Sequence, residues 1–299
     1  MDISKKIFSI FAGSIKVQEN RKEFMEKAKV LFVAQEIMPY LKESHMAHIG
    51  RHLPQGIQEK GKEIRTFMPR YGHINERRNQ LHEVIRLSGM NLIIDDTDHP
   101  LIIKVASIQQ ARMQIYFIDN EDYFQRKFML TDKNNKFYKD NDERAIFYSR
   151  GVLETVKKLG WGPDIVHCHG WITSLVPLNI KRAYKDNPLF TDTKVIYSIY
   201  DDDFPDMMNK DFANKIKMEG ITTKDLKHYK NANYVSMIKA SVDFSDGIIF
   251  GSEEINPELK KYVKDSGKPY LEFQPMDKYI DAYSDFYDEI LVNESVEVD

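Results

Sequence analysis

The stretch from residue 160 to residue 178 constrains the fold more than any other, and it reads GWGPDIVHCHGWITSLVPL. Its short apolar run, DIVHC, follows turn-forming glycines and a proline, which is typical of a buried strand. His169, Gly170, Trp171 and Thr173 come next, before a helical pattern begins. Because ligands bind beyond the carboxyl ends of strands in open α/β sheets, these residues mark a candidate site.

Length and composition indicate an ordinary soluble protein. The chain has 299 residues, 42% of them hydrophobic, and a net charge of -3, so no overall charge attracts it to nucleic acid. No run of about 18 apolar residues occurs, so we expect no membrane span. Cys168 is the single cysteine, which excludes an intramolecular disulfide and fits a reducing compartment. We therefore expect a cytoplasmic protein that binds neither nucleic acid nor membrane.

The first residues resemble a secretion signal only superficially. Their apolar stretch is broken by Ser9 and Gly13, and charged residues resume without a small-residue cleavage site. We interpret residues 1–28 as an N-terminal extension, of which residues 1–24 are either a peripheral helix or an overlong reading frame.

The other end of the chain is acidic. Residues 272–299 hold nine acidic side chains and one lysine, Lys278. Apolar and aromatic residues recur there at spacings of three and four, which is helical spacing. They are Tyr279, Tyr283, Phe286, Tyr287 and Ile290. The pattern favours a closing helix that lays aromatic side chains on the core over a free acidic interaction tail.

Strands and helices alternate between these ends. β-branched and aromatic runs at 29–34 and 63–69 flank a helix that begins after Ser44 and stops at Gly61. A strand, a helix with an N-terminal serine cap and a second strand form a βαβ unit. The chain therefore opens in the manner of a parallel sheet.

The rest of the chain continues this alternation with one interruption. Short apolar runs split by turn residues, such as residues 95–100, indicate inserted antiparallel hairpins. A helical pattern at 140–160 then precedes the DIVHC strand, a helix to about Tyr184, and the strands KVIYSIY and SDGIIFGS. We predict an α/β fold, with a Rossmann-like, mostly parallel sheet and inserted antiparallel hairpins, in one domain at 29–271.

Several motifs in order resemble the starch and glycogen synthase family. They are KVLFVAQEIMPYLK, FMPRYG, YFIDNEDYFQR, DNDERAIFYSR and, in HCHGWIT, the H-x-H-D-W-x-T element. The resemblance covers residues 29–255 and implies the N-terminal half of a two-domain type B glycosyltransferase. That family transfers glucose from ADP-glucose to an α-1,4-glucan, with no metal and no cofactor.

The resemblance also implies a site that faces the cleft between the two domains. His169 is the expected catalytic residue, and the sugar would pack beside it. The implied substrate-binding residues are Lys42, Asp140, Asn141, Arg144, Trp171 and Thr173. Several of them have a structural alternative: His169 caps a strand end, Trp171 fills the core, and Asp140 or Asn141 caps a helix. A lone loop lysine such as Lys42 is usually just solvated.

The chain departs from the family pattern at three places. Gly170 stands where the family has an aspartate. The family has K-x-G-G-L, whose glycines let backbone N–H groups approach a diphosphate, where this chain has Lys42, Glu43, Ser44, His45 and Met46. The family's I-H-N corresponds to Ile199, Tyr200 and Asp201.

The second domain of the family is also missing from the sequence. Two hypotheses follow. The first is an enzyme that works with a separately encoded second domain or by self-association. The second is a catalytically degenerate relative that binds glucan or a partner protein and regulates.

Weaker patterns favour simpler interpretations. His45, His48 and His52 share a helix face but lack a further ligand at zinc spacing, so we expect no metal there. Residues 201–203 resemble the D-x-D motif with which type A glycosyltransferases hold a metal. Because the rest of the chain follows the type B pattern, we expect an acidic loop there instead. Cys168 should point away from the histidines on either side, because side chains alternate along a strand.

Overall fold

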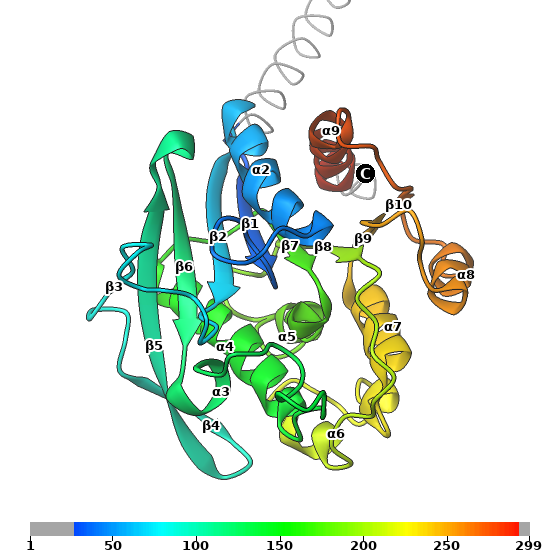
Figure 1. Cartoon of the computed structure of the whole chain (residues 1–299). Helices are drawn as coiled ribbons and strands as arrows, with labels where there is room; N and C mark the ends of the chain where they lie inside the picture. The colour runs from blue at the N-terminus through cyan, green and yellow to red at the C-terminus, as the bar shows by residue number, and fades with distance from the viewer. Residues whose placement is uncertain (1–26, 293–299) are drawn as a thin grey trace, which may run out of the picture.

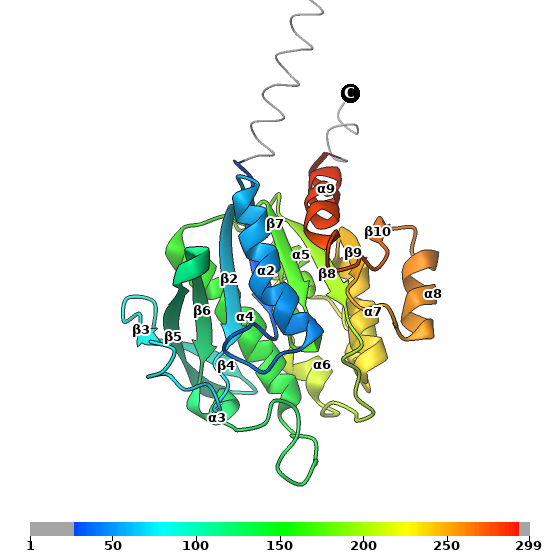
Figure 2. The same cartoon turned by 45° about the horizontal axis from the view of Figure 1, so that its top comes forward.

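The computed structural model describes residues 27–292 and shows a central sheet between two helical layers (Figures 1 and 2). The strands lie in the order β10 (Tyr270–Leu271), β9 (Gly247–Phe250), β8 (Lys194–Ile199), β7 (Ile165–His169), β1 (Lys29–Ala34), β2 (Glu63–Pro69), β6 (Met113–Asp119), β5 (Thr97–Ile108) and β3 (His82–Glu83). Every neighbouring pair from β10 to β6 is parallel. β5 is antiparallel to β6, to β3 and to β4 (Met90–Ile94). The predicted fold class is confirmed.

Helices cover both faces of this sheet. One face carries α2 (His45–Glu59) and α9 (Tyr279–Val292), and the other carries α4 (Asn141–Leu159), α5 (Val176–Lys181) and α7 (Tyr234–Phe244) (Figure 1). The remaining helices are α3 (Glu121–Phe124), α6 (Phe212–Lys215) and α8 (Pro257–Asp265), together with the 3-10 turns η1 (Gln109–Ala111), η2 (Trp171–Thr173) and η3 (Lys227–Tyr229).

The two covered faces explain why the central strands are continuously apolar. In β1, Phe32 packs in the core beneath α2 and α9, while Leu31 and Val33 pack in the core on the opposite face. A parallel strand with both faces buried has no solvent side on which polar residues would alternate. This is the arrangement expected from the runs KVLFVA and DIVHC.

Helix α2 begins as predicted. The Ser44 side chain accepts a hydrogen bond from the Ala47 N–H at 3.0 Å, which satisfies one of the free donors of the first turn. The helix ends at Glu59, and Gly61 follows with a φ of 96°, a conformation that favours glycine. Within α2, Gly56 lets α9 approach closely, because a Cβ there would lie 2.6 Å from the Ile280 side chain.

The inserted hairpin is tighter than the sequence suggested. The turn between β4 and β5 consists of Asp95 and Asp96 alone, with φ values of 49° and 60°, and β5 already begins at Thr97. Two residues with positive φ form the turn type whose twist matches a β-hairpin. Pro100 therefore lies within β5, at an exposed position opposite Asn91. Helix α5 is also shorter than predicted, because it ends at Lys181 rather than near Tyr184.

The closing helix is confirmed as far as residue 292. The five predicted side chains, from Tyr279 to Ile290, are all buried against the sheet. Two of the acids form ion pairs instead of facing only water: Asp281 with Lys60 at 2.6 Å and Asp288 with Lys62 at 2.9 Å. The predictions for residues 1–26 and 293–299 lie outside the described residues. Within the described range, no helix combines the length and apolar character needed to cross a membrane.

Candidate functional site

The tip of β7 holds the two histidines of the H-x-H element on one face of the sheet. Their ring centroids are 3.9 Å apart, and Cys168 between them packs in the opposite core, as predicted. His169 is 1% exposed, and its Nδ1 shares a hydrogen bond of 2.8 Å with the Tyr200 hydroxyl. Burial lowers the pKa of His169 to about 3, so its ring is neutral at pH 7. Its Nε2 has no hydrogen-bond partner among the described residues.

Gly170 follows in a conformation that only glycine adopts readily. Its φ of 86° and ψ of 161° lie in a region that costs other residues about 1–3 kcal/mol. A Cβ at this position would also lie 2.8 Å from the side chain of Gln35. Gln35 thus occupies the space that a side chain at position 170 would need. An aspartate here is incompatible with the present geometry.

Trp171 and Thr173 are buried at the same tip. Trp171 is 4% exposed, and its backbone N–H donates a hydrogen bond to the Asp202 carboxylate at 3.0 Å. Thr173 is fully buried, and its hydroxyl donates to the Gly170 carbonyl at 2.7 Å. In this conformation both residues shape the turn after β7. Their role in substrate binding stays a prediction.

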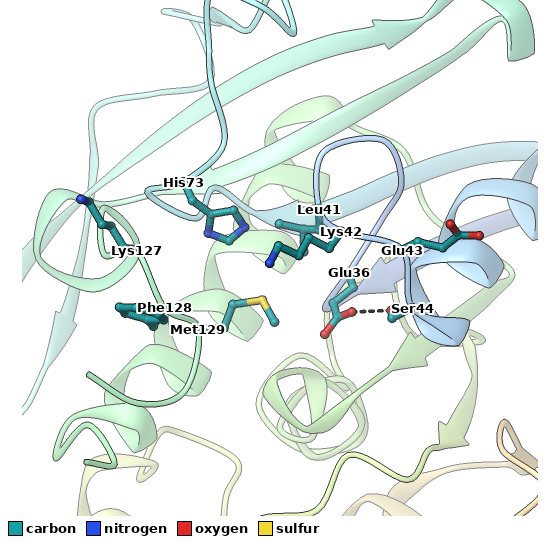
Figure 3. Close-up of a pocket in the computed structure, with 9 residues that line it drawn as sticks. All are labelled: Glu36, Leu41, Lys42, Glu43, Ser44, His73, Lys127, Phe128 and Met129. Atoms are coloured by element: carbon teal, nitrogen blue, oxygen red, sulfur yellow. Dashed lines mark hydrogen bonds between the residues drawn. The ribbon is translucent and has the colours of Figure 1, made fainter. Parts of the chain in front are cut away.

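An open hollow of about 380 Å³ lies beside the carboxyl end of β1 (Figure 3). It is bounded by the loop that leads into α2 and by two other segments of the chain. Its lining residues are Glu36, Leu41, Lys42, Glu43, Ser44, His73, Lys127, Phe128 and Met129. Of the predicted substrate-binding residues, Lys42 lines this hollow. Figure 3 shows its amine directed toward His73 and Met129, whereas the Glu43 carboxylate points to the opposite side.

The N-terminus of α2 already has acceptors of its own. Ser44 caps the helix and donates its hydroxyl proton to the Glu36 carboxylate at 2.6 Å. A helix N-terminus favours an anion, and here the chain supplies a serine oxygen with a carboxylate behind it. His45 turns elsewhere, since its ring lies 5.8 Å from Phe273 and 6.4 Å from Tyr200. The two side chains at the family's glycine positions therefore leave no bare phosphate-binding loop.

The other three predicted residues lie behind one wall of the hollow. Asn141 donates to the Leu130 carbonyl at 2.9 Å, and Arg144 donates to the carbonyls of Met129 and Tyr123. These bonds fix the course of residues 126–130. Asn141 and Arg144 are buried, so they hold the wall in place from behind.

Asp140 supports the same segment in a different way. It sits at the N-cap position of α4, but its side chain makes no capping hydrogen bond. Both carboxylate oxygens pair with the guanidinium of Arg126, at the start of the wall. The helix-cap interpretation is therefore wrong for this side chain, because the arginine takes both oxygens. Direct contact of Asp140, Asn141 and Arg144 with substrate stays a prediction.

Sequence reasoning missed the residues that form the wall itself. Phe128 is 48% exposed, and with Met129 it gives the hollow an apolar side. Arg126 ends the YFIDNEDYFQR motif, so its position before Phe128 was a usable clue. His73, just after FMPRYG, was the other.

The remaining patterns have structural roles. Asp202 is half-buried and accepts hydrogen bonds from the Trp171 backbone N–H and the Tyr234 hydroxyl, so its oxygens already have partners within the protein. The rings of His48 and His52 contact each other at a tilt, with centroids 4.3 Å apart. No group of three potential metal ligands occurs within residues 27–292. Burial raises the pKa of Cys168 well above its usual value, which disfavours a reactive thiolate.

The chain combines a layered α/β architecture with an open hollow at the carboxyl edge of its sheet. A solved structure, the catalytic domain of starch synthase IV from Arabidopsis thaliana bound to ADP and acarbose, shares this fold with a TM-score of 0.64 at 17% identity. The match covers 85% of this chain and 53% of that one. The family model for the starch synthase catalytic domain matches residues 29–268. The chain belongs to this starch synthase catalytic-domain family.

Curated relatives agree with the family assignment. The glycogen synthase of Chlorobium limicola is 41% identical over 173 residues, and that of Chlorobaculum tepidum is 40% identical over 173 residues. The aligned part is 58% of this chain in both cases, but only 35% and 36% of the relatives. The chain therefore spans about a third of the length of these glycogen synthases.

Proposed function

We propose that this chain is the glucan-binding half of a glycogen or starch synthase-type glycosyltransferase in the cytoplasm. It binds an α-1,4-glucan or maltooligosaccharide in the hollow beside β1. Transfer of glucose from ADP-glucose needs a second domain as well. The hollow carries this proposal, because it is open and lies at the carboxyl edge where α/β sheets bind ligands.

The lining of the hollow has the chemistry that a sugar requires. The exposed ring of Phe128 offers a flat apolar surface for the C–H face of a pyranose. Lys42 and His73 supply polar groups for its hydroxyls, and Glu36 supplies an acceptor. A few polar groups placed around an apolar wall fix the orientation of a small ligand.

The described residues offer few groups that could bind the diphosphate of ADP-glucose, which is why the proposal includes a second domain. A departing diphosphate needs preorganised positive charge or N–H donors, commonly the largest contribution to catalysis. Here Ser44 and Glu36 occupy the N-terminus of α2. The aligned part covers only about a third of the glycogen synthases, and the starch synthase IV structure was solved with ADP bound. This supports a nucleotide site built largely by a part of the synthases that the match does not cover.

One observation favours a second candidate function. His169, the expected catalytic residue, is 1% exposed and hydrogen-bonded to Tyr200. A group that must touch the transferred sugar is thereby shielded. The alternative is a catalytically degenerate relative that binds glucan or a partner protein and regulates synthesis.

Calorimetric titration of the chain with maltoheptaose tests the shared part of both proposals. We expect Phe128→Ala to weaken binding about tenfold, because stacking on an aromatic ring contributes on the order of 1 kcal/mol or more. Ile93→Ala is the matched control, since Ile93 is 59% exposed on β4 and does not line the hollow. Equal affinity of wild type and Phe128→Ala would remove the hollow as the glucan site.

A transfer assay then separates the two candidates. Radiolabelled ADP-glucose and maltoheptaose are incubated with the chain, with and without cell lysate, and label in the oligosaccharide is counted. Transfer that requires both the chain and a lysate component supports the enzyme. Glucan binding without transfer in either condition supports the regulatory relative.

A further inference from the structure

One loop makes three contacts with the tip of β7. The loop comprises residues 200–204 and directly follows β8. The Tyr200 hydroxyl is 2.8 Å from His169 Nδ1, and Asp202 accepts the Trp171 N–H at 3.0 Å. The ring of Phe204 meets the Trp171 ring edge-on, with centroids 5.5 Å apart. Alternate residues of a single short loop thus cover both the histidine and the tryptophan of the family motif.

Neighbouring elements hold this loop in place. The Tyr234 hydroxyl, from α7, lies 2.7 Å from Asp202 Oδ1 and 3.0 Å from the Tyr200 carbonyl. Gly251, after β9, gives room for the tyrosine, since a Cβ there would lie 2.8 Å from the Tyr200 ring. Phe204 also packs against Phe137, at 5.1 Å between centroids. The loop is therefore a packed part of the carboxyl edge.

Two glycines make this closure possible. Gly251 accommodates Tyr200, and Gly170 accommodates Gln35, which lies over the turn after β7. In both cases a bulky residue on one strand end occupies the space left by a glycine on another. The closed tip therefore depends on two glycine contacts, Gly251 with Tyr200 and Gly170 with Gln35, and not on a single residue.

We propose that residues 200–204 close the β7 tip, so that a sugar cannot reach it, while the hollow beside β1 stays open. Resting on the proposed glucan site, this inference divides the carboxyl edge into an accessible binding region and a sealed transfer region. Tyr200 covers His169, Phe204 covers Trp171, and Asp202 fixes the turn between them. Transfer at His169 requires this loop to move.

Chemical modification of histidines reports this closure directly. Diethyl pyrocarbonate acylates a neutral imidazole nitrogen, and His169 is neutral at pH 7. Slow modification of His169 therefore reflects shielding and not protonation. His82 is exposed in the same chain and serves as the accessible reference, and His167, covered by Tyr287 and Ser198, reports general opening of the core.

The experiment compares modification rates by peptide mass spectrometry in the folded full chain. In the wild type, we expect His169 to react at least about tenfold more slowly than His82. Tyr200→Ser should raise the His169 rate about tenfold and leave His167 protected, because the Tyr200 hydroxyl lies against His169 Nδ1. Tyr200→Phe keeps the ring and should remain slow. Phe190→Ala, an equally buried aromatic position away from the tip, is the matched control.

Several results would overturn the inference. One is a wild-type His169 that reacts as fast as His82. Another is a His169 rate in Tyr200→Ser no higher than in Phe190→Ala. A parallel rise at His167 also counts against it, because it indicates unfolding of the core. Since no glucan is present, these outcomes are independent of the maltoheptaose titration.

Discussion

Restoring the family's aspartate at position 170 tests the account of the β7 tip most directly. Gly170→Asp forces a side chain into a backbone region used almost only by glycine, at a cost of about 1–3 kcal/mol. The new Cβ also meets Gln35 at 2.8 Å, and such overpacking adds about 1–3 kcal/mol. The sum, about 2–6 kcal/mol, is a large share of the stability of an ordinary domain, which is about 5–15 kcal/mol.

Urea unfolding followed by tryptophan fluorescence measures this cost. Gly170→Asp in a Gln35→Ala background should recover the overpacking part, so the two substitutions couple by about 1–3 kcal/mol in a double-mutant cycle. Gly160→Asp is the control, because Gly160 has a φ of 60° but nothing within 4 Å of its would-be Cβ. A Gly170→Asp variant as stable as the wild type, or no coupling to Gln35, would refute the reasoning.

Two further predictions concern charge. Burial lowers the pKa of His169 to about 3, whereas the pKa of an unfolded histidine is about 6.5. Between these pH values the unfolded chain binds a proton at His169 that the folded chain does not, so the free energy of unfolding falls as the pH falls below about 6.5. The stability difference between wild type and His169→Gln should therefore shrink by about 1 kcal/mol per pH unit from pH 6 to pH 4, and a pH-independent difference contradicts it. Asp288→Asn should cost about 3 kcal/mol in thermal unfolding, since it leaves the 4%-exposed Lys62 amine buried without its ion pair. Asp281→Asn, at the exposed pair with Lys60, should cost less than about 1 kcal/mol, and equal losses would contradict the assignment.

Local sequence rules predicted most of the sheet. The bounds of β1 and β2 match the apolar runs, and Ser44 caps α2 as its position before the helix indicated. These features depend on neighbours within a few residues, which a single sequence displays. The helical spacing of the last aromatics likewise placed α9 with its correct inward face.

The site was harder to predict because its shape depends on distant pairs. Asp140 has the chemistry of a helix cap, but Arg126 reaches it from fourteen residues away and takes both carboxylate oxygens. The burial of His169 depends on Tyr200, which follows the next strand of the sheet. Residue type identified which side chains matter in both cases. Only the packed structure shows whether each faces a ligand or another part of the protein.

Helix α9 has a consequence for where this protein can be cut. The match to the family ends at residue 268, yet Tyr283, Phe286 and Tyr287 complete the apolar core over β1, β7 and β8. A chain ended at the homology boundary would expose Phe32, Ile196 and their neighbours to water as one adhesive patch. A shortened chain that keeps this core covered therefore needs α9 in addition to the residues that match the family model.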